Sequence, residues 1–291
     1  NLSKFLFGDS FSSFIFFQSV VYFFLLYVLF KLFSNELRRN LVLPFFFVYG
    51  CQYFLGGIFG QSKQALAILI IGYSLYFSYK KSLFPYLISF FIASSIHLST
   101  IIAFPILSLI FIRERISLKY SLPILFIVGT ILFRFLSIYD LVEVLSKLPF
   151  IDLIRLDFSD QVIGYIQDER FGSARSISFF NILENFVISC ISIYSILFGN
   201  KILKILGIFY LFSPIFTISF FNIAIFSQRL ARVFKFVEII LIPSFFDYFS
   251  ANKSTKFIFL LLLSILLIKP FIVISNRPGT YLPYKSIYSI F

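Results

Sequence analysis

The sequence predicts an all-α, polytopic integral membrane protein, on the basis of its composition, the length of its apolar segments and the placement of its charges. Of its 291 residues, 59% are hydrophobic and 13% are charged, whereas a soluble domain carries about 25% charged residues. Several apolar runs reach the length of about 18 residues or more that is typical of a membrane-spanning helix. We therefore expect a single transmembrane domain over residues 1–291.

About ten apolar segments are expected to lie in the membrane. Their approximate ranges are 11–30, 41–59, 65–79, 83–96, 98–112, 120–138, 177–198, 205–226, 234–250 and 257–275. The chain begins at Asn1 and contains no methionine, so we expect that the start of the gene product is missing. With no tryptophan present, tyrosine and the basic residues are expected to anchor the helices at the membrane surface.

The basic residues predict which side of the membrane each loop faces. The short loops after the first, third, fifth, seventh and ninth segments contain Lys31, Arg38, Arg39, Lys80, Lys81, Arg113, Arg115, Lys119, Lys201, Lys204, Lys253 and Lys256. Their only acidic residues are Glu36 and Glu114. Because positive charge favours cytoplasmic loops, we place these five loops in the cytoplasm. The outer side then receives Lys63, His97, the loops at 139–176 and 227–233, and the C-terminal tail.

The segments 83–96 and 98–112 are expected to form a short helical hairpin. Each is about 14 residues long, or roughly 21 Å of helix, against a hydrocarbon core of about 30 Å. One continuous span would put two basic loops on opposite sides of the membrane. The apex of the hairpin lies in ASSIHLSTIIAFP (93–105), which holds the only histidine of the chain, His97.

The region 139–176 is the one long hydrophilic stretch, and we expect it to be an extracytoplasmic loop. Its pattern LVEVLSKLPFIDLIRLDF predicts short amphipathic helices on the membrane surface. Its Gly164, Gly172 and Ser173 favour a mobile segment that can bind a glycan, with Arg170 and Arg175 as candidate contacts. The alternative is a solvated surface loop without a ligand.

No familiar motif of soluble enzymes occurs in the chain. GxGxxG, GxxxxGK[ST], HExxH and GxSxG are all missing. One histidine and two distant cysteines make a transition-metal site unexpected, so we predict neither a metal nor a cofactor. The net charge of +12 lies largely in loops between spans, so it indicates membrane topology and not a nucleic-acid partner.

Charged residues within or beside apolar segments are the candidates for function, because a charge in a membrane is costly. They are Lys63, Arg134, Glu184, Arg229, Arg232, Lys235, Glu238 and Asp247. Arg229 and Arg232 are three residues apart and share a helix face, and Lys235 and Glu238 continue that stripe. For Arg232 and Lys235, an internal salt-bridge ladder or snorkelling is an equally good interpretation.

Three stretches together resemble the EpsG-like, Wzy-type polysaccharide polymerases of bacterial surface-glycan synthesis. They are SKQALAILIIGYSLYFSYKKSLFPYLISFFIASSIHLSTIIAFPIL (62–107), SQRLARVFKFVEIILIPSFF (227–246) and LPYKSIYSIF (282–291). The resemblance covers most of the chain from about residue 41. Lys63 stands where the family usually has arginine, which removes a bidentate phosphate contact at that position.

The resemblance implies a polymerase of polyprenyl-diphosphate-linked repeat units on the outer face of the bacterial cytoplasmic membrane. The reaction would be a metal-independent glycosyl transfer that releases polyprenyl diphosphate. Its partners would be the lipid-linked donor and acceptor glycans, membrane lipids and a chain-length regulator protein. Arginine and lysine at the membrane boundary could stabilise the leaving group, and an imidazole could act as base or as an orienting hydrogen-bond partner. The predicted catalytic residues are His97 and Arg229, and the predicted substrate-binding residues are Lys63, Gln64, Arg134, Arg170, Arg175 and Arg232.

Other interpretations remain open at this point. A flippase or other transporter of lipid-linked oligosaccharides would also need basic residues along a cavity, although the chain shows no matching halves. A membrane acyltransferase would need an acidic residue near its histidine, and His97 has none within about 15 residues. Lys63 could be a boundary anchor, and His97 could be a polar turn residue with a structural role.

Overall fold

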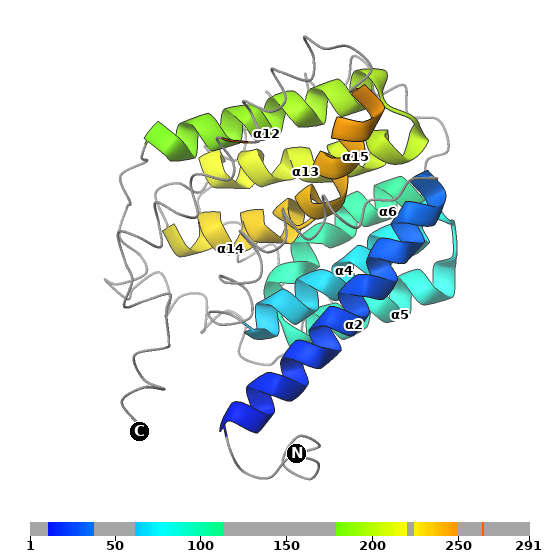
Figure 1. The fold of residues 1–291 in the computed structure, drawn as a ribbon, viewed down its shortest axis with the longest axis vertical. Coiled ribbons are helices and arrows are strands. Elements are labelled where there is room, and N and C mark those ends of the chain that lie inside the picture. Colours follow the sequence, from blue (N-terminus) through cyan, green and yellow to red (C-terminus); the bar gives the residue numbers. More distant parts are fainter. Residues whose placement is uncertain (1–10, 38–61, 113–178, 220–223, 250–263, 265–291) are drawn as a thin grey trace.

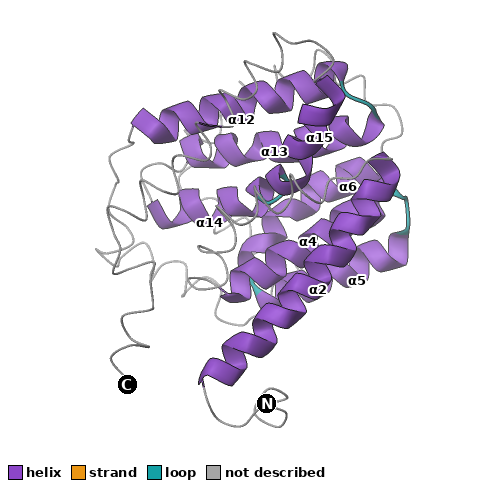
Figure 2. Cartoon of the chain, in the orientation of Figure 1, coloured by secondary structure: helices purple, strands orange, loops and turns teal. Residues whose placement is uncertain are grey.

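The computed structural model describes residues 11–37, 62–112, 179–219, 224–249 and 264, and every element within these ranges is helical (Figures 1 and 2). The elements are α2 (Phe11–Leu37), α4 (Ser62–Tyr79), α5 (Leu83–Ile96), the 3₁₀ helix η2 (Leu98–Ala103), α6 (Phe104–Ile112), α12 (Phe179–Phe198), α13 (Lys201–Ser219), α14 (Ala224–Lys235) and α15 (Glu238–Phe249). The all-α class is confirmed for this part of the chain. The predicted spans at 41–59 and 120–138, and nearly all of 257–275, lie outside the described residues.

Two helices of the described ranges are long and apolar enough to cross a membrane, namely Ser19–Leu37 and Lys201–Ile218. Three further apolar helices, Leu83–Ile96, Leu98–Ile112 and Ile182–Phe198, are shorter. These apolar helices indicate a membrane protein, and the full number of spans stays a prediction.

The turn between α4 and α5 ends the first helix with a residue in the left-handed region. Lys81 has φ 60°, and the amide of Ser82 donates back to the carbonyl of Phe77 at 3.0 Å, as in the usual αL helix end. The Lys81 ammonium reaches across to the last carbonyls of α6, donating to Ile110 O at 2.7 Å and also to Phe111 O. A cation at a helix C-terminus is favourable because the helix dipole is negative there, so Lys81 joins two helix ends.

The predicted hairpin at His97 is confirmed. α5 ends at Ile96 and η2 begins at Leu98, and His97 between them has extended backbone angles (φ −150°, ψ 117°). The following chain returns along α5, since Tyr86 stacks on Phe111 at 5.6 Å and Phe90 lies 4.9 Å from Phe104. The two arms are therefore antiparallel, with His97 at the apex.

α12 and α13 form a second antiparallel pair with a very close approach. Asn200 begins α13 as an N-cap, because its Oδ1 accepts from the amide of Leu203 at 3.0 Å. Further along, a Cβ added to Gly207 would lie 2.9 Å from the carbonyl oxygen of Ser192. Glycine is required at this position because no side chain fits between the two helices.

The fold contradicts one prediction, the outward loop at 227–233. These residues lie inside α14, which ends at Lys235, and after a two-residue turn the chain continues as α15 from Glu238 (Figure 1). Leu230, Ala231, Val233 and Phe234 are buried, while Arg229 and Arg232 are half-buried. The helix is thus amphipathic, and its polar stripe lowers the mean hydropathy that would otherwise reveal it in the sequence.

The centre of the bundle is built around Phe234 of α14. Its ring stacks on Phe216 of α13 at 5.2 Å and lies 4.9 Å from Phe209 of the same helix. Phe236 and Val237, which form the turn between α14 and α15, are also buried. Aromatic packing of this kind holds the kinked pair of helices against α13.

One end of the bundle brings together basic residues from two of the predicted cytoplasmic loops and Glu36 from a third, and we call it the basic end. Lys80 lies 2.5 Å from the carboxylate of Glu36, which raises the pKa of Lys80. Lys201 lies over the ring of Tyr79 at 5.7 Å, and Lys81 binds the end of α6 as described above. Residues that are far apart in the sequence therefore meet where the positive-inside rule expects one face of the membrane.

Candidate functional site

The candidate site is centred on Gln64, in the first turn of α4 and at the opposite end of this helix from Lys80. Its side chain is 2% exposed, and its Nε2 donates to Ser99 Oγ at 3.3 Å and to the backbone oxygen of Arg229 at 3.0 Å. These partners are 35 and 165 residues away in the sequence. A buried amide needs such partners because an unpaired polar group in an apolar interior is costly.

His97 joins this arrangement through Ser99. Its Nδ1 accepts from the backbone amide of Ser99 at 3.3 Å and lies 2.8 Å from Ser99 Oγ. The ring therefore caps the start of η2, while Thr100 Oγ1 donates to the backbone oxygen of His97 at 2.8 Å. We call the resulting series of Arg229 O, Gln64, Ser99 and His97 the polar chain.

The polar chain brings together three residues that the sequence singled out separately, namely Gln64, His97 and Arg229. Ser99 is the link that the sequence analysis did not select. A local signal was present, since serine side chains commonly bond to groups a few residues away along the chain. What the spacing could not reveal is the amide of Gln64 on the other side of Ser99.

Arg229 contributes its backbone oxygen to the polar chain. Its guanidinium can therefore make other contacts. Its side chain is half-buried, as is that of Arg232 one turn further along α14. Lys63 precedes Gln64 on α4, and its side chain is exposed. The predicted substrate-binding residues Arg134, Arg170 and Arg175, together with the loop 139–176, lie outside the described residues.

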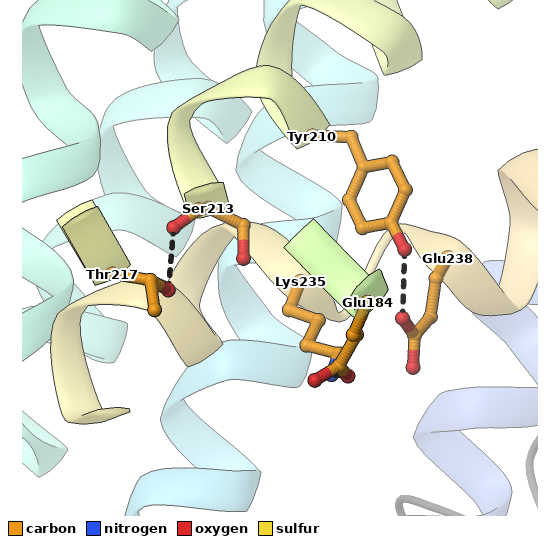
Figure 3. A network of polar contacts seen from close by, with 6 residues as sticks. All are labelled: Glu184, Tyr210, Ser213, Thr217, Lys235 and Glu238. Atoms are coloured by element: carbon orange, nitrogen blue, oxygen red, sulfur yellow. Dashed lines mark hydrogen bonds and ion pairs between the residues drawn. The ribbon is translucent and has the colours of Figure 1, made fainter. Parts of the chain in front are cut away.

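A second polar group lies elsewhere in the bundle, and Figure 3 shows it between α12, α13, α14 and α15. We call its members, Glu184, Tyr210, Lys235 and Glu238, the buried charge layer. Lys235 forms an ion pair with Glu184 of α12, and the hydroxyl of Tyr210 donates to Glu238 Oε2 at 2.9 Å. The turn after Lys235 interrupts the predicted ladder along one helix, and both charged residues bind partners on other helices, Lys235 on α12 and Glu238 on α13.

The two polar groups hold α14 at two places. Gln64 binds the carbonyl of Arg229 in the middle of the helix, and Glu184 binds Lys235 at its end. Hydrogen bonds and ion pairs in a poorly solvated interior are directional. Together they fix the rotation of α14 and thus the direction in which its arginines project.

Comparison with known proteins supplies the family. The sequence profile of the EpsG family matches residues 1–286, almost the whole chain. The chain belongs to the EpsG family. No curated protein and no solved structure gives a significant match.

Membership in the EpsG family implies a role in polysaccharide biosynthesis. The predicted resemblance is thereby confirmed over a longer stretch than the three motifs that suggested it. Two of those motifs, 62–107 and 227–246, supply every member of the polar chain of this EpsG-family protein. The site therefore lies where two separate family motifs meet.

Proposed function

We propose that this EpsG-family protein polymerises oligosaccharide repeat units carried on polyprenyl diphosphate. In the proposed reaction, a hydroxyl oxygen of the acceptor glycan forms a bond to the anomeric carbon of the donor. The bond from that carbon to the diphosphate oxygen breaks, and its electron pair stays with the diphosphate. The hydroxyl proton passes to the diphosphate or to solvent, and polyprenyl diphosphate is released.

The observation that carries this proposal is the polar chain. Gln64, Ser99, His97 and Arg229 come from α4, η2, the hairpin apex and α14, and they meet at one end of the bundle. Such convergence of polar groups in an otherwise apolar protein is typical of a functional site. Its residue types, an imidazole and an arginine-bearing helix, suit a negatively charged leaving group.

The placement of the polar chain supports a reaction on the outer face of the membrane. The basic end contains Lys80 and Lys201, whereas Gln64 lies at the other end of α4. The 18 residues of α4 correspond to roughly 27 Å at ~1.5 Å per residue, close to a hydrocarbon core of ~30 Å. If the basic end faces the cytoplasm, the polar chain faces outward.

In this proposal the arginines bind the diphosphate. Arg229 grips the diphosphate through two parallel hydrogen bonds, which a planar guanidinium can form. Arg232 and Lys63 add positive charge along the approach, and Gln64 holds Arg229 and Ser99 in place. Arg134, Arg170 and Arg175 are proposed contacts to the donor or the acceptor.

The test uses the purified protein in lipid vesicles. The substrate is the lipid-linked repeat unit extracted from cells that lack this gene. We expect a ladder of longer glycans together with released polyprenyl diphosphate, and no ladder from the Arg229→Ala protein. Movement of the lipid-linked unit across the vesicle membrane without any ladder would instead establish the transporter alternative.

A further inference from the structure

The polar chain has two ends whose hydrogen-bonding roles are chemically determined. The backbone oxygen of Arg229 can only accept a hydrogen bond, and the backbone amide of Ser99 can only donate one. Gln64 Nε2 lies 3.0 Å from the first, and His97 Nδ1 lies 3.3 Å from the second. Every proton between these two ends can be assigned from these constraints.

The assignment begins at Gln64. The atom that faces the Arg229 carbonyl must be the amide nitrogen, because the amide oxygen would face another acceptor. The same nitrogen carries a second hydrogen, which it donates to Ser99 Oγ at 3.3 Å. Ser99 Oγ accepts this bond, so its own hydrogen is available to His97 Nδ1 at 2.8 Å.

His97 completes the assignment. A hydrogen on Nδ1 would point toward the hydrogen of the Ser99 amide, so Nδ1 must present its lone pair instead. Nδ1 therefore accepts hydrogen bonds from both the backbone amide and the hydroxyl of Ser99. In a neutral imidazole one nitrogen carries the hydrogen and the other accepts, so the hydrogen of neutral His97 is on Nε2.

We infer that His97 acts through Nε2–H as a hydrogen-bond donor to an anionic oxygen of the substrate, not as the base of the reaction. A base must offer a lone pair to the acceptor hydroxyl, and the only lone pair of neutral His97 is engaged by Ser99. A donor suits the oxygens of a diphosphate, which only accept. The assignment of the tautomer does not depend on the proposed function. The role of His97 at the diphosphate rests on the proposed function.

The single histidine allows a direct test of the tautomer. With histidine labelled with ¹⁵N in the ring only, and an affinity tag that contains no histidine, the protein gives the two ring nitrogens of His97 and no other labelled signals. At a pH where the imidazole is neutral, we expect Nε2 to carry the hydrogen and Nδ1 to show the shift of a hydrogen-bonded acceptor. A spectrum with the hydrogen on Nδ1 would overturn the inference.

Ser99→Ala provides a variant of the same measurement, with Ser95→Ala as its control. Ser95 lies two residues before His97, is exposed, and donates to the backbone oxygen of Ile92. We expect Ser99→Ala to shift the Nδ1 signal because the hydroxyl donor is lost, and Ser95→Ala to leave it unchanged. An Nδ1 signal that is equal in both variants would show that Ser99 does not hold the ring.

A pair of substitutions tests the role. His97→Asn keeps an acceptor near the position of Nδ1, and asparagine is a good N-cap, but it loses the donor at Nε2. His97→Gln places an amide N–H near Nε2 and loses the cap. We expect His97→Gln to keep most of the polymerisation rate and His97→Asn to lose about 100- to 1000-fold, at matched protein levels in the membrane.

The other outcomes contradict the donor role in distinct ways. If both variants lose about 100-fold or more, His97 is a base. If His97→Asn matches the wild type and His97→Gln fails, the residue serves only as a cap. If the wild-type protein makes no polymer, the proposed function fails together with the role at the diphosphate, while the labelling experiment still decides the tautomer.

Discussion

Lys235 and Glu184 form an ion pair that ties the C-terminal end of α14 to α12, across 51 residues of sequence. Their side chains are 18% and 7% exposed, so the pair is largely withdrawn from solvent. The same helix carries Arg229, whose carbonyl oxygen is held by Gln64. The orientation of the proposed diphosphate-binding helix therefore depends on partners in two other helices.

Removing one member of this ion pair is expected to destabilise the protein. Glu184→Gln removes the carboxylate that forms an ion pair with the largely buried ammonium of Lys235, and breaking a buried ion pair in this way costs about 3–5 kcal/mol. The pair between Glu36 and Lys80 provides the control because it is more exposed, at 22% and 40%, and Glu36→Gln there should cost about 0–1 kcal/mol. Thermal unfolding in detergent measures both. Equal effects of the two substitutions would show that the buried pair does not hold α14.

The charge-swapped protein, Glu184→Lys with Lys235→Glu, is expected to recover part of the stability that each single substitution loses. The reason is that the swap restores one positive and one negative group at the same place. The recovery should extend to polymer length, because the orientation of α14 is restored. A double variant no better than the singles would contradict the pairing.

Arg229→Lys is expected to fold and insert but to make no long polymer. Gln64 binds the backbone oxygen of Arg229, so this substitution leaves the polar chain intact. A lysine ammonium cannot form two parallel bonds to a diphosphate, and the loss of one such contact lowers the rate about 100- to 1000-fold. The assay is a glycan ladder from cells that lack the native gene, at matched protein levels. A wild-type ladder from Arg229→Lys would reject the bidentate contact.

Gln64→Glu is expected to lower the stability by about 1–3 kcal/mol. The substitution keeps the shape of the side chain but turns the donor that faces Arg229 O and Ser99 Oγ into an acceptor. Its neighbour Lys63 is exposed, and Lys63→Gln should leave the unfolding temperature unchanged. If Gln64→Glu unfolds at the same temperature as Lys63→Gln and the wild type, the amide of Gln64 is not the link between the two motifs.

Gly207→Ala is expected to separate α12 and α13 and to cost about 1–3 kcal/mol. The added methyl group would lie 2.9 Å from the Ser192 carbonyl oxygen and 3.1 Å from Ser195 Cβ. Lys204→Ala, at an exposed position of the same helix, is the control for the alanine itself. Unchanged thermal unfolding of Gly207→Ala would mean that the two helices are not in close contact there.

The topology prediction concerns the two ends of the bundle. Reporter fusions after Lys81, Lys119 and Lys204 should report cytoplasm, and one near Gly164 should report the outside. In a protein without its native cysteines, Ser95→Cys should react in whole cells with a thiol reagent that cannot cross membranes, and Lys80→Cys should not. A cytoplasmic signal at Gly164, or labelling of the cysteine at position 80, would place the polar chain on the wrong face.

Most of the helices in the described part of the chain could be predicted from the sequence. Segments 65–79, 83–96 and 177–198 match α4, α5 and α12 closely, and the break at His97 was expected. These features are local, because an apolar run favours a helix in the membrane and a polar interruption ends it. The error at 227–233 has a related cause. In α14 the basic stripe offsets the buried face, so hydropathy averaged along the chain misses an amphipathic helix.

The partners of the buried polar groups could not be predicted in this way. The sequence indicated that Gln64, His97, Arg229 and Lys235 need an explanation, because polar groups in an apolar chain are costly. It did not indicate that Gln64 meets Arg229 across 165 residues, or that Lys235 forms an ion pair with Glu184 on α12. The cost of burial demands that a partner exist, but helix packing in three dimensions chooses which one. The direction of the Ser99–His97 side-chain bond follows from that choice, since Gln64 donates to Ser99 Oγ and leaves the hydroxyl hydrogen for His97 Nδ1.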